Sequence, residues 1–224
     1  MAIKNINLEY ERKILNLLDI KYDGLKWCEL GDQLMVSDTG KITGIAKDYY
    51  LSLNVDHISI DINGNNGAFP LDLDFPVPFI FIDQFDVVTD YGMSEHINDQ
   101  YRVFKNAHDM CKQRGIMIHH VPLVGTYPGH CRYYYTQEFM NELADYCGYG
   151  VINTEILDDS DSKNIKKLVG VTFLKIEDRE FIFENEFYDI DGLEDTGDTT
   201  HSGNYTRRDG LLSRIIKKFF KSNP

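Results

Sequence analysis

The feature of this sequence that most constrains its fold is an alternation of helical and strand patterns. Helical patterns predict helices over 7–18, 45–53, 101–112 and 136–146, and short apolar runs predict strands over 25–30, 57–61, 85–89, 115–121, 150–157 and 168–176. Strands that alternate with helices favour a parallel sheet with helices on both of its faces. We therefore expect an α/β fold with a doubly wound, mostly parallel sheet.

The chain is long enough to bury one sizeable core. We expect a helical N-terminal segment over 1–24, an α/β domain over 25–190, and a C-terminal part over 191–224. The C-terminal part begins with an acidic stretch rich in Asp, Thr and Gly, which is expected to be a mobile connector. It continues over 209–221 with apolar residues at helical spacing opposite Lys and Arg. Such a basic amphipathic helix could dock on its own domain, on a protein partner or on an anionic membrane surface.

Charge and cysteine content narrow the class of partner. The formal net charge of -13 opposes attraction to nucleic acid, because phosphate-binding surfaces concentrate Lys and Arg. The four cysteines form no CxxC pair, and no apolar run at the N-terminus resembles a signal peptide or a membrane span. These observations predict a cytoplasmic protein that acts on a small molecule.

Acidic residues and a glycine follow the first predicted strands. Glu29 and Gly31 end the first strand, Asp61 ends the second, and Asp72 follows a turn. In doubly wound sheets, ligands bind beyond the carboxyl ends of the strands. A glycine for close approach, a carboxylate for two ribose hydroxyls and one for an exocyclic amine would suit an adenosine-type ligand. The alternative is that Asp61 and Asp72 only cap turns.

The order of these motifs resembles that of the class I S-adenosylmethionine-dependent methyltransferases. The resemblance covers about residues 25–176 and rests on Glu29-Leu30-Gly31, Ile60-Asp61, Leu71-Asp72, Phe85-Asp86-Val87-Val88-Thr89, Ser94-Glu95-His96-Ile97 and Gly115-Ile116-Met117-Ile118. It implies a seven-stranded sheet and S-adenosylmethionine as the methyl donor.

The resemblance also implies donor-binding residues. Glu29 and Gly31 would lie beside the methionine part of the donor, Asp61 would hold its ribose, and Asp72 would contact its adenine. The stretch 85–97, which includes Glu95, would lie beneath the reactive methyl.

One departure from the family pattern concerns the first loop. The family has a glycine-rich GxGxG, whereas Asp32-Gln33-Leu34-Met35 follows Gly31 here. Either the loop takes an unusual path, with Gly40 and Gly44 arriving later, or the donor pocket is closed and the protein is a non-catalytic relative.

Histidines near the later strands are the candidates for catalysis. Imidazole titrates near neutrality and could take a proton from a hydroxyl or amine, and the candidates are His96, His120 and His130. His120 and His130 flank a loop that would overhang the strand ends. Because neighbouring strand residues face opposite ways, at least one of His119 and His120 must point away from the site. The cysteines and histidines lack the paired spacing of a zinc site, so no metal is expected.

Three functions follow from these patterns. The first is methyl transfer from S-adenosylmethionine to a small or medium polar acceptor, such as a sugar or another metabolite. The second is a non-catalytic methyltransferase-like module that binds a partner. The third is an NAD-dependent oxidoreductase, which the absence of GxGxxG disfavours although an acid after the second strand would suit it.

Overall fold

A six-stranded sheet forms the centre of the protein. The computed structural model describes residues 2–160 and 164–198, and the sheet has the strand order β5-β2-β6-β7-β10-β9. Its strands are β2 (Lys26–Leu30), β5 (Asp56–Ile60), β6 (Phe85–Tyr91), β7 (Cys111–Pro122), β9 (Gly150–Asp158) and β10 (Lys167–Leu174). The first four strands pair in parallel, and β10 runs antiparallel to both β7 and β9. The expectation of a doubly wound, mostly parallel sheet is confirmed.

The expectation of seven strands is wrong for the described residues. A further strand would lie beside β5, at the edge of the sheet, but the chain there forms only one isolated parallel bridge, between Ile60 and Phe69. Pro70, Pro76 and Pro78 follow the bridge, and proline has no N–H to donate to a neighbouring strand. The segment instead forms short 3-10 turns, η1 (Asn65–Gly67) and η2 (Phe79–Phe81).

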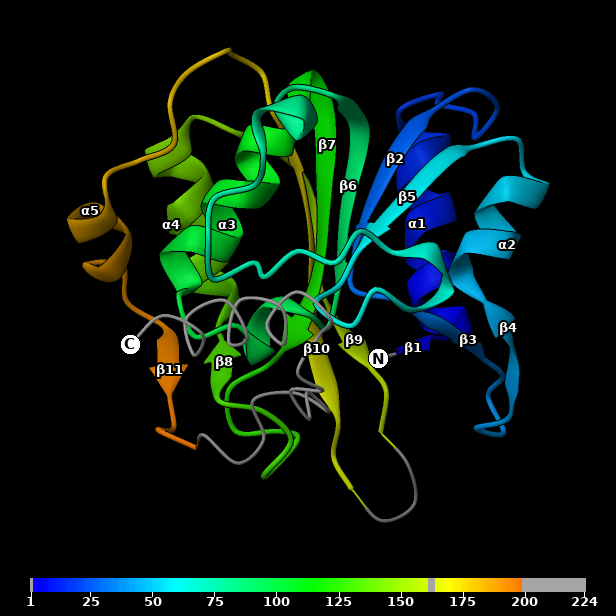
Figure 1. Cartoon of the computed structure of the whole chain (residues 1–224). Coiled ribbons are helices and arrows are strands. Elements are labelled where there is room, and N and C mark those ends of the chain that lie inside the picture. The colour runs from blue at the N-terminus through cyan, green and yellow to red at the C-terminus, as the bar shows by residue number, and fades with distance from the viewer. Residues whose placement is uncertain (1, 161–163, 199–224) are drawn as a thin grey trace, which may run out of the picture.

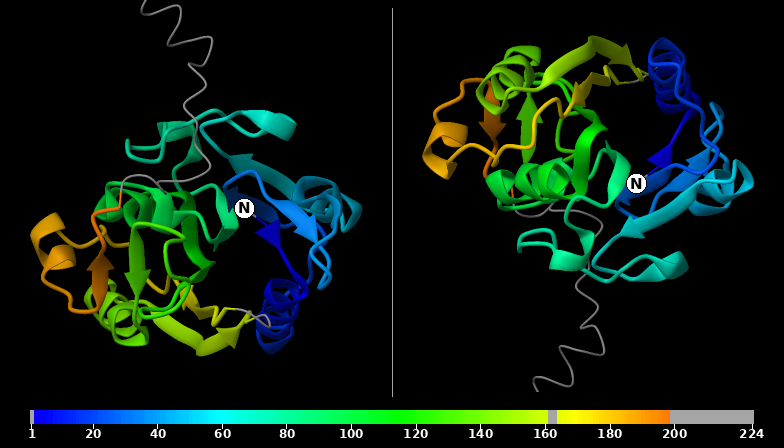
Figure 2. Two further views of the ribbon diagram at one scale, coloured as in Figure 1. Left: turned by 90° about the horizontal axis from the view of Figure 1, so that it is seen from below. Right: turned by 90° about the horizontal axis from the view of Figure 1, so that it is seen from above.

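Helices cover both faces of the sheet (Figure 1). One face carries α1 (Asn5–Leu17) and α2 (Ala46–Ser52), and the other carries α3 (Gln100–Met110), α4 (Gln137–Cys147) and α5 (Glu184–Tyr188). Neighbouring residues of β6 face opposite layers, since Val87 packs with the α1 core and Val88 with the α3 core. In views from below and above, the blue N-terminal helix and the orange α5 lie on opposite sides of the molecule (Figure 2).

Two small sheets, made of five short strands, were not expected from the sequence. β3 (Leu34–Val36) and β4 (Ile42–Ile45) form a hairpin directly after β2, and β1 (Ala2–Ile3) pairs with β3. β8 (Tyr133–Tyr135) pairs with β11 (Leu193–Asp195). Residues 193–195, within the stretch expected to be a connector, pair with β8 as a strand.

The described residues include no helix with the length and apolarity that crossing a membrane requires. The basic amphipathic helix expected over 209–221 lies outside the described residues.

Candidate functional site

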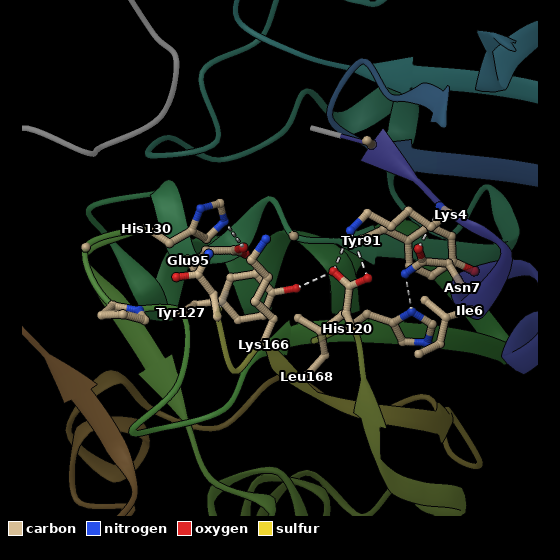
Figure 3. A pocket seen from close by; sticks show the side chains of 16 residues that line it. Lys4, Ile6, Asn7, Tyr91, Glu95, His120, Tyr127, His130, Lys166 and Leu168 are labelled. Carbon is tan, nitrogen blue, oxygen red and sulfur yellow. Dashed lines mark hydrogen bonds and ion pairs between the residues drawn. The ribbon is translucent and has the colours of Figure 1, made fainter. Parts of the chain in front are cut away.

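A cavity of about 540 Å³ opens where β6 and β7 end. Tyr91 and Gly92 come from the end of β6, and His120 comes from β7. The N-terminal segment around Lys4 and the region around Lys166 close the other sides, as the close-up shows (Figure 3). This is the edge of the sheet at which doubly wound folds bind ligands.

Glu95 is a buried carboxyl at one end of this cavity. It lies in the 3-10 turn η3 (Ser94–His96), which is held by Asp90 because the Asp90 Oδ1 accepts the N–H groups of Met93 and Ser94 at 3.0 and 3.1 Å. A Cβ on Gly92 would lie 3.1 Å from Glu95 Oε1, so glycine leaves room for the carboxyl group. Burial raises the pKa of Glu95 well above its usual range, and the nearby Asp90 adds to the shift. Its Oε2 has no hydrogen-bond partner among the described residues.

Two histidines flank this carboxyl group. His96 Nε2 lies 3.9 Å from Glu95 Oε1, and His130 Nε2 lies 4.0 Å from the same oxygen. The His96 side chain is 7% exposed, whereas that of His130, on the loop after β7, is 47% exposed. The structure therefore brings together Glu95, His96 and His130, which are separated by up to 35 residues along the chain.

His120 lines the cavity, and a hydrogen bond to Asn7 holds its ring in place. Its Nδ1 accepts from Asn7 Nδ2 at 2.7 Å, and Asn7 is oriented because its Oδ1 accepts the Lys4 N–H. Nδ1 is then unprotonated, so the proton is on Nε2, which is fully enclosed. Burial lowers the pKa of His120 to about 3. In this arrangement neither ring nitrogen can take a proton from a molecule in the cavity.

His119 faces the opposite side of the sheet, as strand alternation requires. Its Nδ1 lies 3.1 Å from Asp90 Oδ2, and its ring packs on Phe104 and Phe173. The expectation that one of the two neighbouring histidines points away from the site is confirmed.

Three of the four acids expected to bind a donor, Glu29, Asp61 and Asp72, lie outside the lining of this cavity, whereas Glu95 lies within it. Glu29 is buried within β2, 3.1 Å from His57 Nε2. Asp61 is 1% exposed, and its two oxygens accept the backbone N–H groups of Asp32 and Asn63, each at 2.9 Å. Asp72 accepts the N–H of Asp74 at 3.1 Å. Both Asp61 and Asp72 thus cap turns.

Gln33 lies between the ends of β2 and β6, where the family pattern has glycines. Gly31 has a φ of 94°, a conformation that favours glycine, and it turns the chain after β2. The Gln33 Nε2 then donates to the carbonyl oxygens of Leu30 and Tyr91 at 3.4 and 3.2 Å. The side chain is buried, and its Oε1 has no partner within residues 2–160 and 164–198.

Sequence reasoning missed one group of cavity residues. Lys4 Nζ lies 2.6 Å from Asp159 Oδ2, and the Tyr127 hydroxyl donates to the same oxygen at 2.6 Å. The Lys4–Asp159 pair joins the N-terminal segment to the end of β9 across one wall of the cavity. No motif signals a contact between residues so far apart in the chain.

Comparisons with known proteins identify the fold of this chain through solved structures rather than through its sequence. No protein-family model matches the chain, and no curated protein matches it. Among solved structures, the N-methyltransferase NodS of Bradyrhizobium japonicum, in complex with S-adenosylhomocysteine, is similar with a TM-score of 0.52 and 12% identity, covering 78% of this chain and 89% of that one. The 1,6-didemethyltoxoflavin-N1-methyltransferase of Burkholderia thailandensis, also with bound S-adenosylhomocysteine, has a TM-score of 0.51 and 9% identity, covering 76% of this chain and 79% of that one. With helices on both faces of a mostly parallel sheet of matching arrangement, the chain has the Rossmann-like fold of the class I S-adenosylmethionine-dependent methyltransferases.

Proposed function

We propose that the protein is an S-adenosylmethionine-dependent methyltransferase whose acceptor binds in the cavity beyond β6 and β7. The observation that carries the proposal is the position of this cavity in a methyltransferase fold, at the carboxyl ends of the central strands. Its volume of about 540 Å³ is within the range of small-molecule sites. Charged groups of both signs line it, including Lys4, Asp159 and Lys166, which favours a small or medium polar acceptor.

One buried acceptor atom supports binding of the methionine end of the donor. Gln33 Oε1 lacks a hydrogen-bond partner among the described residues. Buried acceptors are normally paired, and an ammonium group such as that of methionine donates three hydrogen bonds. We assign the methionine end to Gly31 and Gln33. The bound donor would supply an activated methyl group on its sulfonium.

The chain's own contribution is to orient the acceptor. Methyl transfer from a sulfonium is an in-line displacement, for which correct placement of the acceptor supplies much of the rate. His120 contributes as a rigid wall because its Nδ1 is bound to Asn7. His130 lines the cavity beside Glu95 and is the histidine that we propose meets the acceptor, while His96 packs against its ring, outside the lining.

The ribose end of the donor requires a rearrangement. Asp61 is the proposed ribose ligand, but its oxygens are occupied by the N–H groups of Asp32 and Asn63. For ribose hydroxyls to bind there, the backbone of Asp32 must move away from the carboxylate. This observation favours a second function, a non-catalytic methyltransferase-like module in which the Asp32 contact is permanent.

Calorimetric titration with S-adenosylmethionine and S-adenosylhomocysteine separates the two functions. A methyltransferase is expected to bind both, and Asp61→Asn should weaken binding about tenfold or more, because a lost hydrogen bond to a charged group costs about 1.5–3 kcal/mol. Asp86→Asn is the matched control, since Asp86 lies at the other end of β6 and should leave the affinity unchanged. If the folded wild-type protein binds neither compound, the methyltransferase proposal fails and the non-catalytic module stands.

A further inference from the structure

We propose that Glu95, His96 and His130 bind one divalent transition-metal ion at the end of the cavity. Each residue offers one ligand atom, and these atoms all lie within 4.8 Å of one another. Two come from consecutive residues of η3, and the third comes from the loop after β7. The inference rests on these three side chains and does not depend on the proposed methyl donor.

The geometry is close to that of a formed site. In a tetrahedral zinc site with ligands at about 2.0–2.2 Å, neighbouring ligand atoms lie roughly 3.3–3.5 Å apart. Here both imidazole nitrogens lie 3.9–4.0 Å from Glu95 Oε1. The His130 side chain is on a loop and half exposed, so its ring can approach Glu95, while His96 and Glu95 would each shift by a few tenths of an ångström. Figure 3 shows His130 facing Glu95 across the end of the cavity.

A second, independent observation is the unpaired oxygen of Glu95. The Glu95 side chain is 2% exposed, and its Oε2 is enclosed with no hydrogen-bond partner among the described residues. Burying a carboxyl oxygen without a partner is unfavourable, and a cation coordinated by the carboxylate would offset that cost. Asp90 holds the η3 turn that carries this carboxyl group, and Gly92 leaves room for it.

The ligand set indicates which ion binds. Two imidazoles and one carboxylate suit Zn²⁺ and neighbouring divalent transition metals, whereas Ca²⁺ and Mg²⁺ prefer oxygen ligands alone. Three protein ligands leave at least one position open. Because Glu95 and His130 line the cavity, that position would face a molecule bound there and would coordinate one of its oxygen or nitrogen atoms.

Calorimetric titration of the full chain with ZnCl₂, after dialysis against a chelator and without any methyl donor, tests the site. We expect one Zn²⁺ per chain in the high-affinity phase. Glu95→Gln and His130→Ala should each lower the Zn²⁺ affinity at least about 100-fold. Even the loss of a residue that only orients a metal ligand lowers metal affinity about 10–100-fold. Asp159→Asn is the matched control, because Asp159 is another acid of the same cavity and should change the affinity less than about twofold.

Two further readouts decide the outcome. Co²⁺ bound by the wild-type protein should show the intense visible absorption of a four-coordinate site, and this band should be absent in His130→Ala. A large excess of MgCl₂ should not displace Zn²⁺. The proposal is overturned if wild-type protein shows no high-affinity Zn²⁺ phase, if both ligand variants retain it, or if Mg²⁺ displaces it. Since no donor is present, none of these results depends on the test of methyltransferase function.

Discussion

Glu11 is the most unusual single residue of the core. It is fully buried on α1, and its carboxyl group accepts hydrogen bonds from the hydroxyls of Tyr22, Tyr50 and Tyr91 at 2.6, 2.6 and 2.7 Å. Burial raises the pKa of Glu11, and the three hydroxyl donors oppose the shift. Because Tyr91 also lines the cavity, this cluster fixes one of the cavity walls from behind.

Replacing Glu11 should therefore cost stability in proportion to the hydroxyls left unpaired. Glu11→Leu leaves the buried hydroxyls of Tyr50 and Tyr91 without an acceptor, and each buried orphan costs about 1–3 kcal/mol, so the free energy of unfolding should fall by at least about 2 kcal/mol. Glu11→Gln keeps one acceptor oxygen and should lose less. Urea denaturation of both variants measures the difference, and equal losses would show that the hydroxyls do not determine the cost.

The buried His108 is expected to make the stability of the protein depend on pH. Its Nε2 donates to the Arg179 carbonyl oxygen at 2.9 Å, its Nδ1 lies 2.7 Å from the Tyr149 hydroxyl, and burial, aided by the Lys175 charge, lowers its pKa to about 3. The unfolded chain takes up a proton near pH 6.5 while the folded chain does not. The stability contribution is thus complete above pH 6.5 and is lost as the pH falls toward 3.

Between pH 7.5 and pH 5, wild-type protein should lose about 2 kcal/mol of unfolding free energy relative to His108→Gln. Urea denaturation of both proteins at both pH values gives the comparison, in which the cost of the substitution itself cancels. Parallel pH dependence in the two proteins would contradict a buried neutral His108.

At the scale of elements, the sequence predicted most of the sheet and helices that the structure has. Helices α1 to α4 and the six central strands lie within a few residues of their expected bounds, because hydrophobic periodicity and turn residues act locally. The β3–β4 hairpin could not be predicted, since its pairing with β1 depends on residues 2–3, far from it in sequence. The seventh strand, which the described residues lack, was expected from the family resemblance alone. The three prolines of its segment disfavour a strand there.

The start of α3 depends on one side chain. Asp99 precedes the helix, and its Oδ1 accepts the Arg102 N–H at 2.8 Å, which satisfies one of the free N–H groups of the first turn. Asp99→Ala should lower the free energy of unfolding by about 1 kcal/mol. Asp109→Ala is the control, because within residues 2–160 and 164–198 the Asp109 side chain pairs with Lys105 one turn earlier and caps no helix, and it should cost less than about 0.5 kcal/mol. A control loss as large as the loss in Asp99→Ala would exclude capping as the cause.

At the scale of the whole molecule, the site was harder to predict than the fold. Histidines 120 and 130 could be placed near one loop because the loop joins them in sequence. The contact of Asn7 with His120 and that of Lys4 with Asp159 bring together residues more than a hundred positions apart. Only the packing of α1 against the sheet creates them. The hydrogen bond that Asp61 accepts from Asp32 likewise depends on the path of the Asp32 backbone. The sequence did not predict this path, because the loop lacks the glycines of the family pattern.

The two layers of the protein share one sheet, so they should unfold together. Trp27, the only tryptophan, is fully buried in the α1 core, between the sheet and α1, which we call the α1 layer. Its neighbour Cys28 packs in the α3 core, on the other face of the sheet, which we call the α3 layer. Because β2 contributes side chains to both cores, unfolding of one core would expose the side chains that β2 buries in the other. The two cores should therefore unfold in one two-state transition. Urea unfolding followed by Trp27 fluorescence and by far-ultraviolet circular dichroism should therefore give coincident midpoints.

Core truncations on the two faces sharpen this test. Ile14→Ala on α1 and Met140→Ala on α4 each remove fully buried apolar volume and should cost about 2–5 kcal/mol. Each variant should shift the fluorescence and circular dichroism transitions by the same amount, although only Ile14 lies in the layer of Trp27. If Ile14→Ala moved the fluorescence transition alone, the α1 layer would be an independently unfolding unit, and residues 1–24 would be a separable segment of the chain.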